Sequence, residues 1–146
     1  MPVAQVPNIK VWSVAQQYAD AAIVLLDSNK LLPAAVLASL ATEILLKSFN
    51  ATYDHRGRAK PISGHELTKL FGKLSDADRV NLINALADIN PETDLLSRLT
   101  KFDSLFTKAR YFYEPNALFG IDMDIVYLAR DLCSAVFAVA KLKSSK

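Results

Sequence analysis

The chain has 146 residues, of which 51% are hydrophobic and 22% are charged, and its formal net charge at pH 7 is +2. This length and apolar content suit one globular domain with a substantial core, and they exclude an intrinsically disordered chain. The small positive charge is too little to indicate a general nucleic-acid binder.

The expected location follows from the cysteine content and the N-terminus. The single cysteine, Cys133, allows no internal disulfide and fits a reducing compartment. Residues 1–5 have no basic stretch leading into an apolar one, so no signal peptide is expected. The apolar run at residues 31–41 is shorter than a membrane span and contains Pro33. We therefore expect a soluble, cytoplasmic protein with no membrane segment.

The first two helices are predicted from apolar residues that recur at helical spacing. Residues 8–28 form the first of them. Pro33 is expected at the first position of the second, which should end near Ala51, because proline is favoured where a helix opens.

One polar strip interrupts the otherwise apolar surface of the second helix. Ser39, Glu43 and Lys47 recur every four residues and so lie on one side of it. A Glu and a Lys on a mostly buried helix need partners, because a bare buried charge is costly. The strip therefore marks a polar seam, a subunit interface or a site.

A polar loop and a short third helix are predicted next. Residues 52–62 are the most polar loop of the chain. Ser63 and Glu66 have the spacing of a capping box, which predicts a helix over residues 65–74. This assignment places His65 in the first helical turn, near the positive end of the helix dipole.

Two further helices are expected before a break. Ser75 has the pattern of an N-cap for a fourth helix over residues 76–89. Asn90 followed by Pro91 has the pattern of another helix start, and the apolar period continues from there to Ala109.

The final helix is predicted over residues 122–142, after Pro115 ends the preceding pattern. Residues 141–146 are expected to be a frayed basic tail. The whole chain, residues 1–146, therefore predicts a single all-α domain. Its architecture should be an up-and-down helical bundle of four long helices plus one or two short ones.

Three motifs, in this order, resemble the HEPN family of small helical domains. They are E-I-L-L-K at residues 43–47, G-H-E-L at residues 64–67 and K-A-R-Y at residues 108–111. The resemblance implies a helical bundle that dimerises through long helices. It also implies one of two functions, since many members are metal-independent RNA-cutting toxins of defence and toxin–antitoxin systems. Others are non-cutting nucleotide-binding or scaffolding domains.

The family's cutting members carry an Arg followed, after four to six residues, by a His near the start of a late helix. The chain departs from that pattern because its two histidines are His55 and His65. Arg58 and His65 have six residues between them, but they flank the polar loop and the third helix. The resemblance therefore implies a non-catalytic member.

The candidate ligand cluster consists of Glu43, Lys47, His65, Arg110 and Tyr111. Glu43 and Lys47 have the favourable order for a helical ion pair, so a purely structural brace is the simpler interpretation. The functional interpretation is that Glu43 and Lys47 form a polar cluster with His65 and Arg110, around a ligand or across a dimer axis. His65 is also the candidate acid–base residue, against the alternative of a packed histidine that donates one hydrogen bond.

The polar loop supplies a second candidate surface. Arg56, Arg58 and Lys60, next to Tyr53, are suited to phosphate contacts and to stacking on a base. Three basic residues in a loop are more often only solvated surface.

Three functions compete. The first is a homodimeric binding module for a nucleotide, an RNA or a protein partner such as an antitoxin. The second is an endoribonuclease in which His65 acts with Arg58 or Arg110 on the RNA 2′-hydroxyl. The third is a plain scaffold. No cofactor or metal is expected, because the chain has no Gly-rich phosphate loop, C-x-x-C or H-E-x-x-H motif.

Overall fold

The computed structural model describes residues 6–52, 54–58, 60, 63–105 and 122–145. These residues are helical with connecting turns and include no strand, which confirms the all-α class. The predicted break at Pro115 and the apolar period from residue 106 to Ala109 lie outside the described residues.

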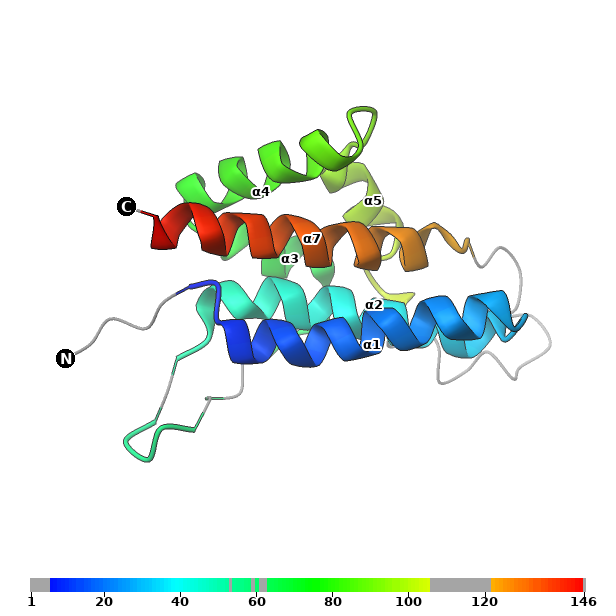
Figure 1. Ribbon diagram of the computed structural model, residues 1–146, viewed down its shortest axis with the longest axis horizontal. Helices are drawn as coiled ribbons and strands as arrows, with labels where there is room; N and C mark the ends of the chain where they lie inside the picture. The colour runs from blue at the N-terminus through cyan, green and yellow to red at the C-terminus, as the bar shows by residue number, and fades with distance from the viewer. Residues whose placement is uncertain (1–5, 53, 59, 61–62, 106–121, 146) are drawn as a thin grey trace.

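The first two helices, α1 (Ile9–Asp27) and α2 (Leu31–Lys47), lie side by side as an antiparallel pair (Figure 1). Asn8 caps α1, since its side chain accepts a hydrogen bond from the backbone N–H of Val11 at 3.1 Å. The chain reverses at Asn29, whose φ of 59° is a left-handed conformation that asparagine tolerates.

Both ends of α2 differ from the prediction. The helix begins at Leu31, so Pro33 is its third residue and not its first. A proline is tolerated there because the first-turn N–H groups have no acceptor within the helix. At the other end, η1 (Ser48–Asn50) is a 3-10 turn that replaces the predicted last α-turn. The carbonyl of Ser48 accepts from the backbone N–H of Asn8 at 2.9 Å, which joins this end of α2 to the start of α1.

The last helix, α7 (Asp124–Ser144), packs against both α1 and α2. Small side chains allow this close approach of helix backbones, because alanine leaves little between them. The buried alanines of the three helices are Ala15, Ala19, Ala22, Ala34, Ala35, Ala38, Ala41, Ala129, Ala135 and Ala140.

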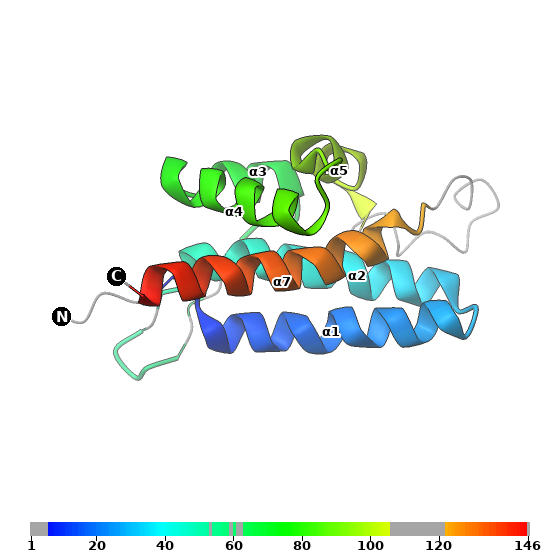
Figure 2. The same ribbon diagram turned by 45° about the horizontal axis from the view of Figure 1, so that its top comes forward.

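Three shorter helices form a second group on the other side of α2 and α7 from α1 (Figure 2). They are α3 (Leu67–Gly72), α4 (Asp76–Ile89) and α5 (Leu95–Lys101). Buried leucines join this group to α2 and α7 in one core, namely Leu45, Leu46, Leu67, Leu70, Leu82, Leu86, Leu99, Leu128 and Leu132.

The start of α4 agrees with the prediction. Its first turn also explains why the predicted fraying of the C-terminal tail is wrong. Ser75 caps α4 by accepting from the backbone N–H of Asp78 at 3.1 Å. The buried carboxylate of Asp78 lies 2.5 Å from the ammonium of Lys143. This ion pair holds the end of α7, which continues to Ser144, so the predicted fraying of residues 141–146 is wrong for residues 141–144.

The start of α5 was also wrongly predicted. Asn90 and Pro91 belong to a turn, in which the backbone N–H of Thr93 donates to the carbonyl of Asn90 at 3.1 Å. The helix begins four residues after Pro91, where Asp94 accepts from the backbone N–H of Ser97 at 3.3 Å. The side chain of Asn90 accepts from the backbone N–H of Glu92 at 3.3 Å, so the asparagine that the pattern assigned as a helix cap forms an Asx turn instead.

A bidentate ion pair fixes α5 against the first turn of α7. The guanidinium of Arg98 donates to both carboxylate oxygens of Asp124, at 2.8 and 2.9 Å. An acidic residue in the first turn is also favoured by the helix dipole. This contact orients α5 and the residues that follow it, including Asp103.

One stretch of the described residues, Leu31–Asn50, is long and apolar enough to cross a membrane, with a mean hydropathy of 1.5. However, 56% of it is buried against the rest of the protein. The core helix of a globular protein has the same composition, so the stretch is weak evidence for a membrane segment.

Candidate functional site

The centre of the candidate site is the carboxylate of Glu43, which is carried into the core by α2. Its side chain is only 5% exposed. One oxygen lies 3.3 Å from the ammonium of Lys47, one turn further along the helix, whose side chain is 17% exposed. The predicted burial and pairing of these two residues are therefore confirmed.

The second partner of Glu43 is His65, 22 residues further along the chain. The imidazole Nδ1 lies 2.7 Å from the other carboxylate oxygen of Glu43. The histidine side chain is 52% exposed, so one edge of the ring is held by a buried group while much of the ring faces solvent. The predicted contact between Glu43 and His65 is present.

His65 does not lie in a helix, contrary to the prediction. The helix α3 begins at Leu67 with Glu66 at its N-cap, and the predicted capping box with Ser63 is absent. Gly64 has a φ of 111°, which turns the chain just before the histidine. The ring therefore reaches Glu43 from an extended segment, and the predicted effect of the α3 dipole on His65 does not apply.

The N-terminus of α3 is capped instead by Asp103, a residue that sequence reasoning missed. Its carboxylate accepts from the backbone N–H of Thr68 at 2.8 Å and from the hydroxyl of Thr68 at 2.6 Å. Asp103 follows α5, so this cap comes from a distant part of the chain. The pairing of Thr68 and Asp103 has no local signal in the sequence, because 35 residues separate them.

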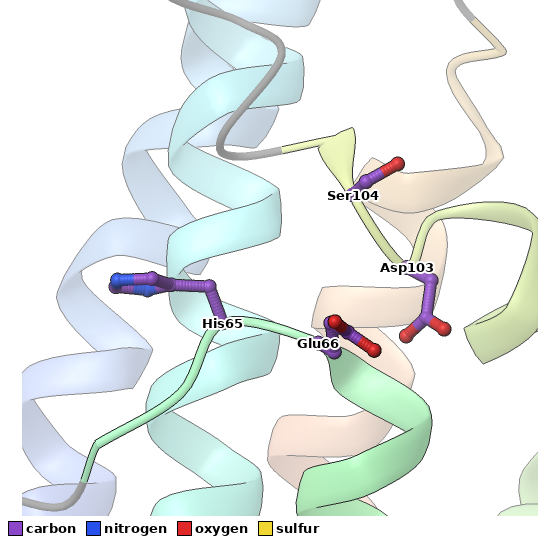
Figure 3. Close-up of a pocket in the computed structure, with 4 residues that line it drawn as sticks. All are labelled: His65, Glu66, Asp103 and Ser104. Carbon is purple, nitrogen blue, oxygen red and sulfur yellow. The ribbon is translucent and has the colours of Figure 1, made fainter.

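An open pocket of about 440 Å³ lies beside these residues. Its described lining residues are His65, Glu66, Asp103 and Ser104. Figure 3 shows the imidazole of His65 directed away from Glu66 and Asp103. The pocket therefore has a carboxylate-rich wall and an imidazole at its edge.

A cation stands close to the carboxylate-rich wall. The ammonium of Lys69 lies 3.4 Å from the carboxylate of Glu66, and both side chains are largely exposed. Lys73, which directly follows α3, is also exposed, and its ammonium is 3.5 Å from the carbonyl of Ser63. The pocket thus offers hydrogen-bond acceptors, one of which, Glu66, is paired with the ammonium of Lys69.

The basic loop forms an organised turn apart from His65. Asp54 accepts from the backbone N–H groups of Arg56 and Arg58, at 2.9 and 3.0 Å. The Nε of Arg58 donates to the other oxygen of Asp54 at 3.0 Å. The hydrogen bond from the Arg58 backbone, followed by those from Arg56 and the Arg58 side chain, lowers the pKa of Asp54 below its ordinary value.

The turn leaves its basic side chains in solvent, and Figure 1 shows it projecting beyond the end of the α1–α2 pair. Arg56, Arg58 and Lys60 are all exposed. Within the described residues, the guanidinium of Arg58 pairs with Asp54 and not with His65. The structure therefore does not bring the predicted pair of Arg58 and His65 together.

The two remaining predicted members of the cluster, Arg110 and Tyr111, lie outside the described residues, as does Tyr53 of the loop. Among the residues that are described, no group of three or more His, Cys, Asp or Glu side chains is placed to hold a metal ion. Cys133 is buried on α7, and its burial raises the pKa of its thiol to about 12, which makes it a poor nucleophile.

Comparison of the chain with protein-family models, with curated proteins and with solved structures finds no match.

Proposed function

We propose that this protein is a HEPN-like, homodimeric binding module that holds a nucleotide or an RNA and does no chemistry on it. The observation that carries the proposal is the contact between Glu43 and His65 at the edge of the pocket. A buried carboxylate needs a partner, but that partner could be buried as well. Here the second partner, besides Lys47, is an imidazole that remains half exposed beside a pocket.

The chemistry of the pocket favours a ligand that carries hydroxyl and amino groups. Ionised Glu66 and Asp103 only accept hydrogen bonds. Ribose hydroxyls and the exocyclic amino groups of bases are donors and match such acceptors. A phosphate would be repelled by this wall but attracted to Lys69 at the rim, which fits a nucleotide held by its sugar or base.

The contact with Glu43 gives His65 a defined role in this binding. When a neutral imidazole donates its Nδ1 proton to a carboxylate, its Nε2 becomes the acceptor on the opposite edge of the ring. A ring fixed in this way offers a ligand one oriented polar atom and one flat face. Both are suited to a nucleoside and lose little freedom on binding.

An endoribonuclease is the second candidate, and the same carboxylate–imidazole contact is the observation that favours it. A carboxylate that orients a histidine is a common acid–base arrangement. Metal-independent RNA cleavage also needs a cation at the phosphate, close to that histidine. Arg58, one of the two arginines considered for this role, is paired with Asp54, and the other, Arg110, lies outside the described residues. We favour binding without cleavage because the chain has no histidine after His65 and so lacks the late Arg–His motif of the cutting members.

The remaining parts of the proposal come from the sequence. We retain a bundle of four long helices, a soluble cytoplasmic protein and a homodimer. The mean hydropathy of +0.17 supports a homodimer, since it is high for a small domain that stands alone. A place in a defence or toxin–antitoxin system, with an antitoxin or other protein partner, is implied only by the family resemblance.

The test is binding of a fluorescein-labelled single-stranded RNA of mixed sequence, measured by fluorescence anisotropy at fixed salt. The comparison is with DNA of the same sequence and with ATP. We expect RNA or ATP to bind, and His65→Ala and Glu43→Gln to weaken binding by about tenfold, or about 1.4 kcal/mol. His55→Ala is the matched control, because His55 is an exposed histidine of the basic loop, and it should leave the affinity unchanged.

Two outcomes would count against the proposal. Loss of binding in His55→Ala but not in His65→Ala would move the site to the loop, and no binding of any of the three probes would remove the nucleotide ligand. Incubation of the same RNA in EDTA separates the second candidate. Cleavage at defined positions that disappears in His65→Ala would establish the endoribonuclease in place of the binding module.

A further inference from the structure

One end of the molecule carries exposed cations from three separate parts of the chain. We call it the basic end and define it by Lys10 of α1, Arg56, Arg58 and Lys60 of the loop, and Lys141 of α7, all of which are exposed. Figures 1 and 2 both show the start of α1, the loop after η1 and the end of α7 at the same end of the molecule. The formal net charge of +2 does not reveal this grouping, because it is a sum over the whole chain.

Contacts between these segments hold the cations near one another. The backbone N–H of Asn8, just before α1, donates at 2.9 Å to the carbonyl of the first residue of η1, which joins the start of α1 to the end of α2. The backbone N–H of Lys60 donates to the carbonyl of Thr52 at 2.7 Å, so the loop returns to the point where it leaves η1. Ile9 and Lys141 line the same pocket, which brings the end of α7 to the start of α1.

Three acids near this end are already paired, which leaves the exposed cations in excess. The buried carboxylates of Glu43 and Asp78 each have a lysine partner from the last turn of a helix. Asp54 is paired with Arg58. The other four residues of the basic end form no ion pair with any residue that the structure describes.

The position of Lys10 is unfavourable for the stability of its own helix. It lies in the first turn of α1, where the helix dipole disfavours a cation, and that turn contains no acid to offset it. The acids of α1, Asp20 and Asp27, lie in its second half. The helix therefore carries its charges in the reverse of the order that its dipole favours. A cation placed in this way contributes to the field of the surface, which attracts anions.

The turn of the loop presents the guanidinium of Arg58 in a fixed orientation. Asp54 accepts from the backbone N–H groups of Arg56 and Arg58 and from the Nε of Arg58. The two terminal amino groups of Arg58 form no hydrogen bond with Asp54. A guanidinium with free donors can bind two oxygens of one phosphate group, and a fixed one loses less freedom when it does so.

We infer that the basic end binds the sugar–phosphate backbone of an RNA strand whose nucleotide occupies the pocket beside His65. Lys47 ends α2 four residues after Glu43, so the end of the helix lies about 6 Å along α2 from the residue that holds His65. His65 also follows Lys60 by five residues, which span at most about 18 Å. A strand held in the pocket therefore reaches the basic end within a few nucleotides.

A nucleic acid fits this surface better than a membrane does. Binding to a bilayer surface needs large apolar side chains beside the cations. Among the described residues of the loop, the first turn of α1 and the last turn of α7, the exposed ones are those of Ile9 and Leu142. A phosphate backbone needs cations and hydrogen-bond donors, and its contacts do not depend on the bases. This inference rests on the proposed function and adds a second, sequence-independent contact to its pocket.

The experiment measures anisotropy of the same labelled RNA between about 50 and 300 mM KCl. One phosphate contact with a single strand contributes about 0.7 to the slope of log affinity against log salt concentration. We expect Lys10→Gln, Lys60→Gln and Lys141→Gln each to lower the slope by about 0.7 and the affinity at about 100 mM salt by about fivefold, for RNA and DNA alike. Lys30→Gln is the matched control, since it removes the same charge from an exposed lysine beyond the far end of α1, and it should change neither quantity.

The outcomes separate the basic end from the pocket. His65→Ala should weaken RNA binding without lowering the slope, because it removes no phosphate contact. Full RNA affinity in the three lysine variants, with a loss in His65→Ala, would overturn the basic end alone. A lower slope in the lysine variants, with full affinity in His65→Ala, would support the basic end and overturn the pocket.

Two results with wild type would also overturn the inference. ATP binding without RNA binding would remove the basic end and leave the pocket. Binding to vesicles of phosphatidylcholine and phosphatidylserine in equal parts, without RNA binding, would make an anionic membrane the partner. Circular dichroism of each variant shows whether the fold is retained, which is expected because the changed lysines are exposed.

Discussion

Replacing Lys47 should destabilise the protein more than replacing Glu43, although the two residues form one ion pair. In Lys47→Met the carboxylate of Glu43 stays in the core and keeps only the imidazole of His65 as a partner. Removing one member of a buried pair costs about 3–5 kcal/mol, because the remaining charge is neither solvated nor compensated. We expect a loss in the free energy of unfolding within that range.

Glu43→Gln should cost less, about 1.5–3 kcal/mol, which is the value of hydrogen bonds to a charged group. Glutamine has almost the same shape, so no cavity forms. The ammonium of Lys47 can still be solvated in this variant, because its side chain is partly exposed and long enough to reach water. The double variant should therefore resemble Glu43→Gln alone. A double-mutant cycle should then give a coupling as large as the cost of Lys47→Met, about 3–5 kcal/mol.

Urea unfolding at pH 7, followed by circular dichroism, measures all four proteins. Lys69→Met is the matched control, since the pair of Lys69 and Glu66 is largely exposed and such pairs contribute about 0–1 kcal/mol. The reasoning is wrong if Lys47→Met costs no more than Lys69→Met. It is also wrong if Glu43→Gln proves the more damaging of the two substitutions.

Three further predictions concern the supporting contacts. Asp103→Ala removes the cap of α3 and should lower the free energy of unfolding by about 0.5–2 kcal/mol in thermal melts; an unchanged melting temperature would contradict the role of the cap. Arg98→Lys loses the bidentate contact with Asp124 and should cost about 1–2 kcal/mol, and recovery of full stability in this variant would argue against that geometry. Burial raises the pKa of the Cys133 thiol from 9.0 to about 12, so the thiol contributes stability below pH 9 that is lost as the pH rises toward 12. In Cys133→Ala the free energy of unfolding should therefore depend less steeply on pH between 9 and 12. The same pH dependence in the variant and in wild type would count against the raised pKa.

Local signals predicted much of the architecture. The caps formed by Asn8 and Ser75 bind backbone groups three residues away, so the short-range sequence contains all the information they need. The ion pair of Glu43 and Lys47 spans one helical turn and is equally local. The contact with His65 was predictable for another reason, because a buried carboxylate needs further partners and the polar cluster named His65 as one of them.

Elements whose ends depend on distant residues were not predictable in the same way. The cap of α3 comes from Asp103, and the end of α7 is held by Asp78 of α4. In both cases a local pattern indicated another outcome, a capping box at Ser63 and a frayed tail over residues 141–146. A local cap contributes only about 1 kcal/mol, so a tertiary contact that satisfies a buried charge can outweigh it.

The position of His65 follows from such a competition between two sets of contacts. A capping box at Ser63 would satisfy α3 locally and stabilise it by about 1 kcal/mol, but it would place His65 in the first turn of that helix. The extended segment instead lets the imidazole reach Glu43, whose burial without a second partner would cost more. Asp103 then supplies the cap that the capping box would have given.

The polarity of one residue on α2 therefore decides where α3 begins. Glu43→Leu removes the need for the imidazole, so we expect the capping box to form and α3 to lengthen toward Ser63. Backbone chemical shifts of residues 63–66 should move from extended to helical values, while those of α4 stay unchanged as the internal control. Extended shifts that persist at His65 in this variant would mean that the turn at Gly64, with its φ of 111°, sets the start of α3 without help from Glu43.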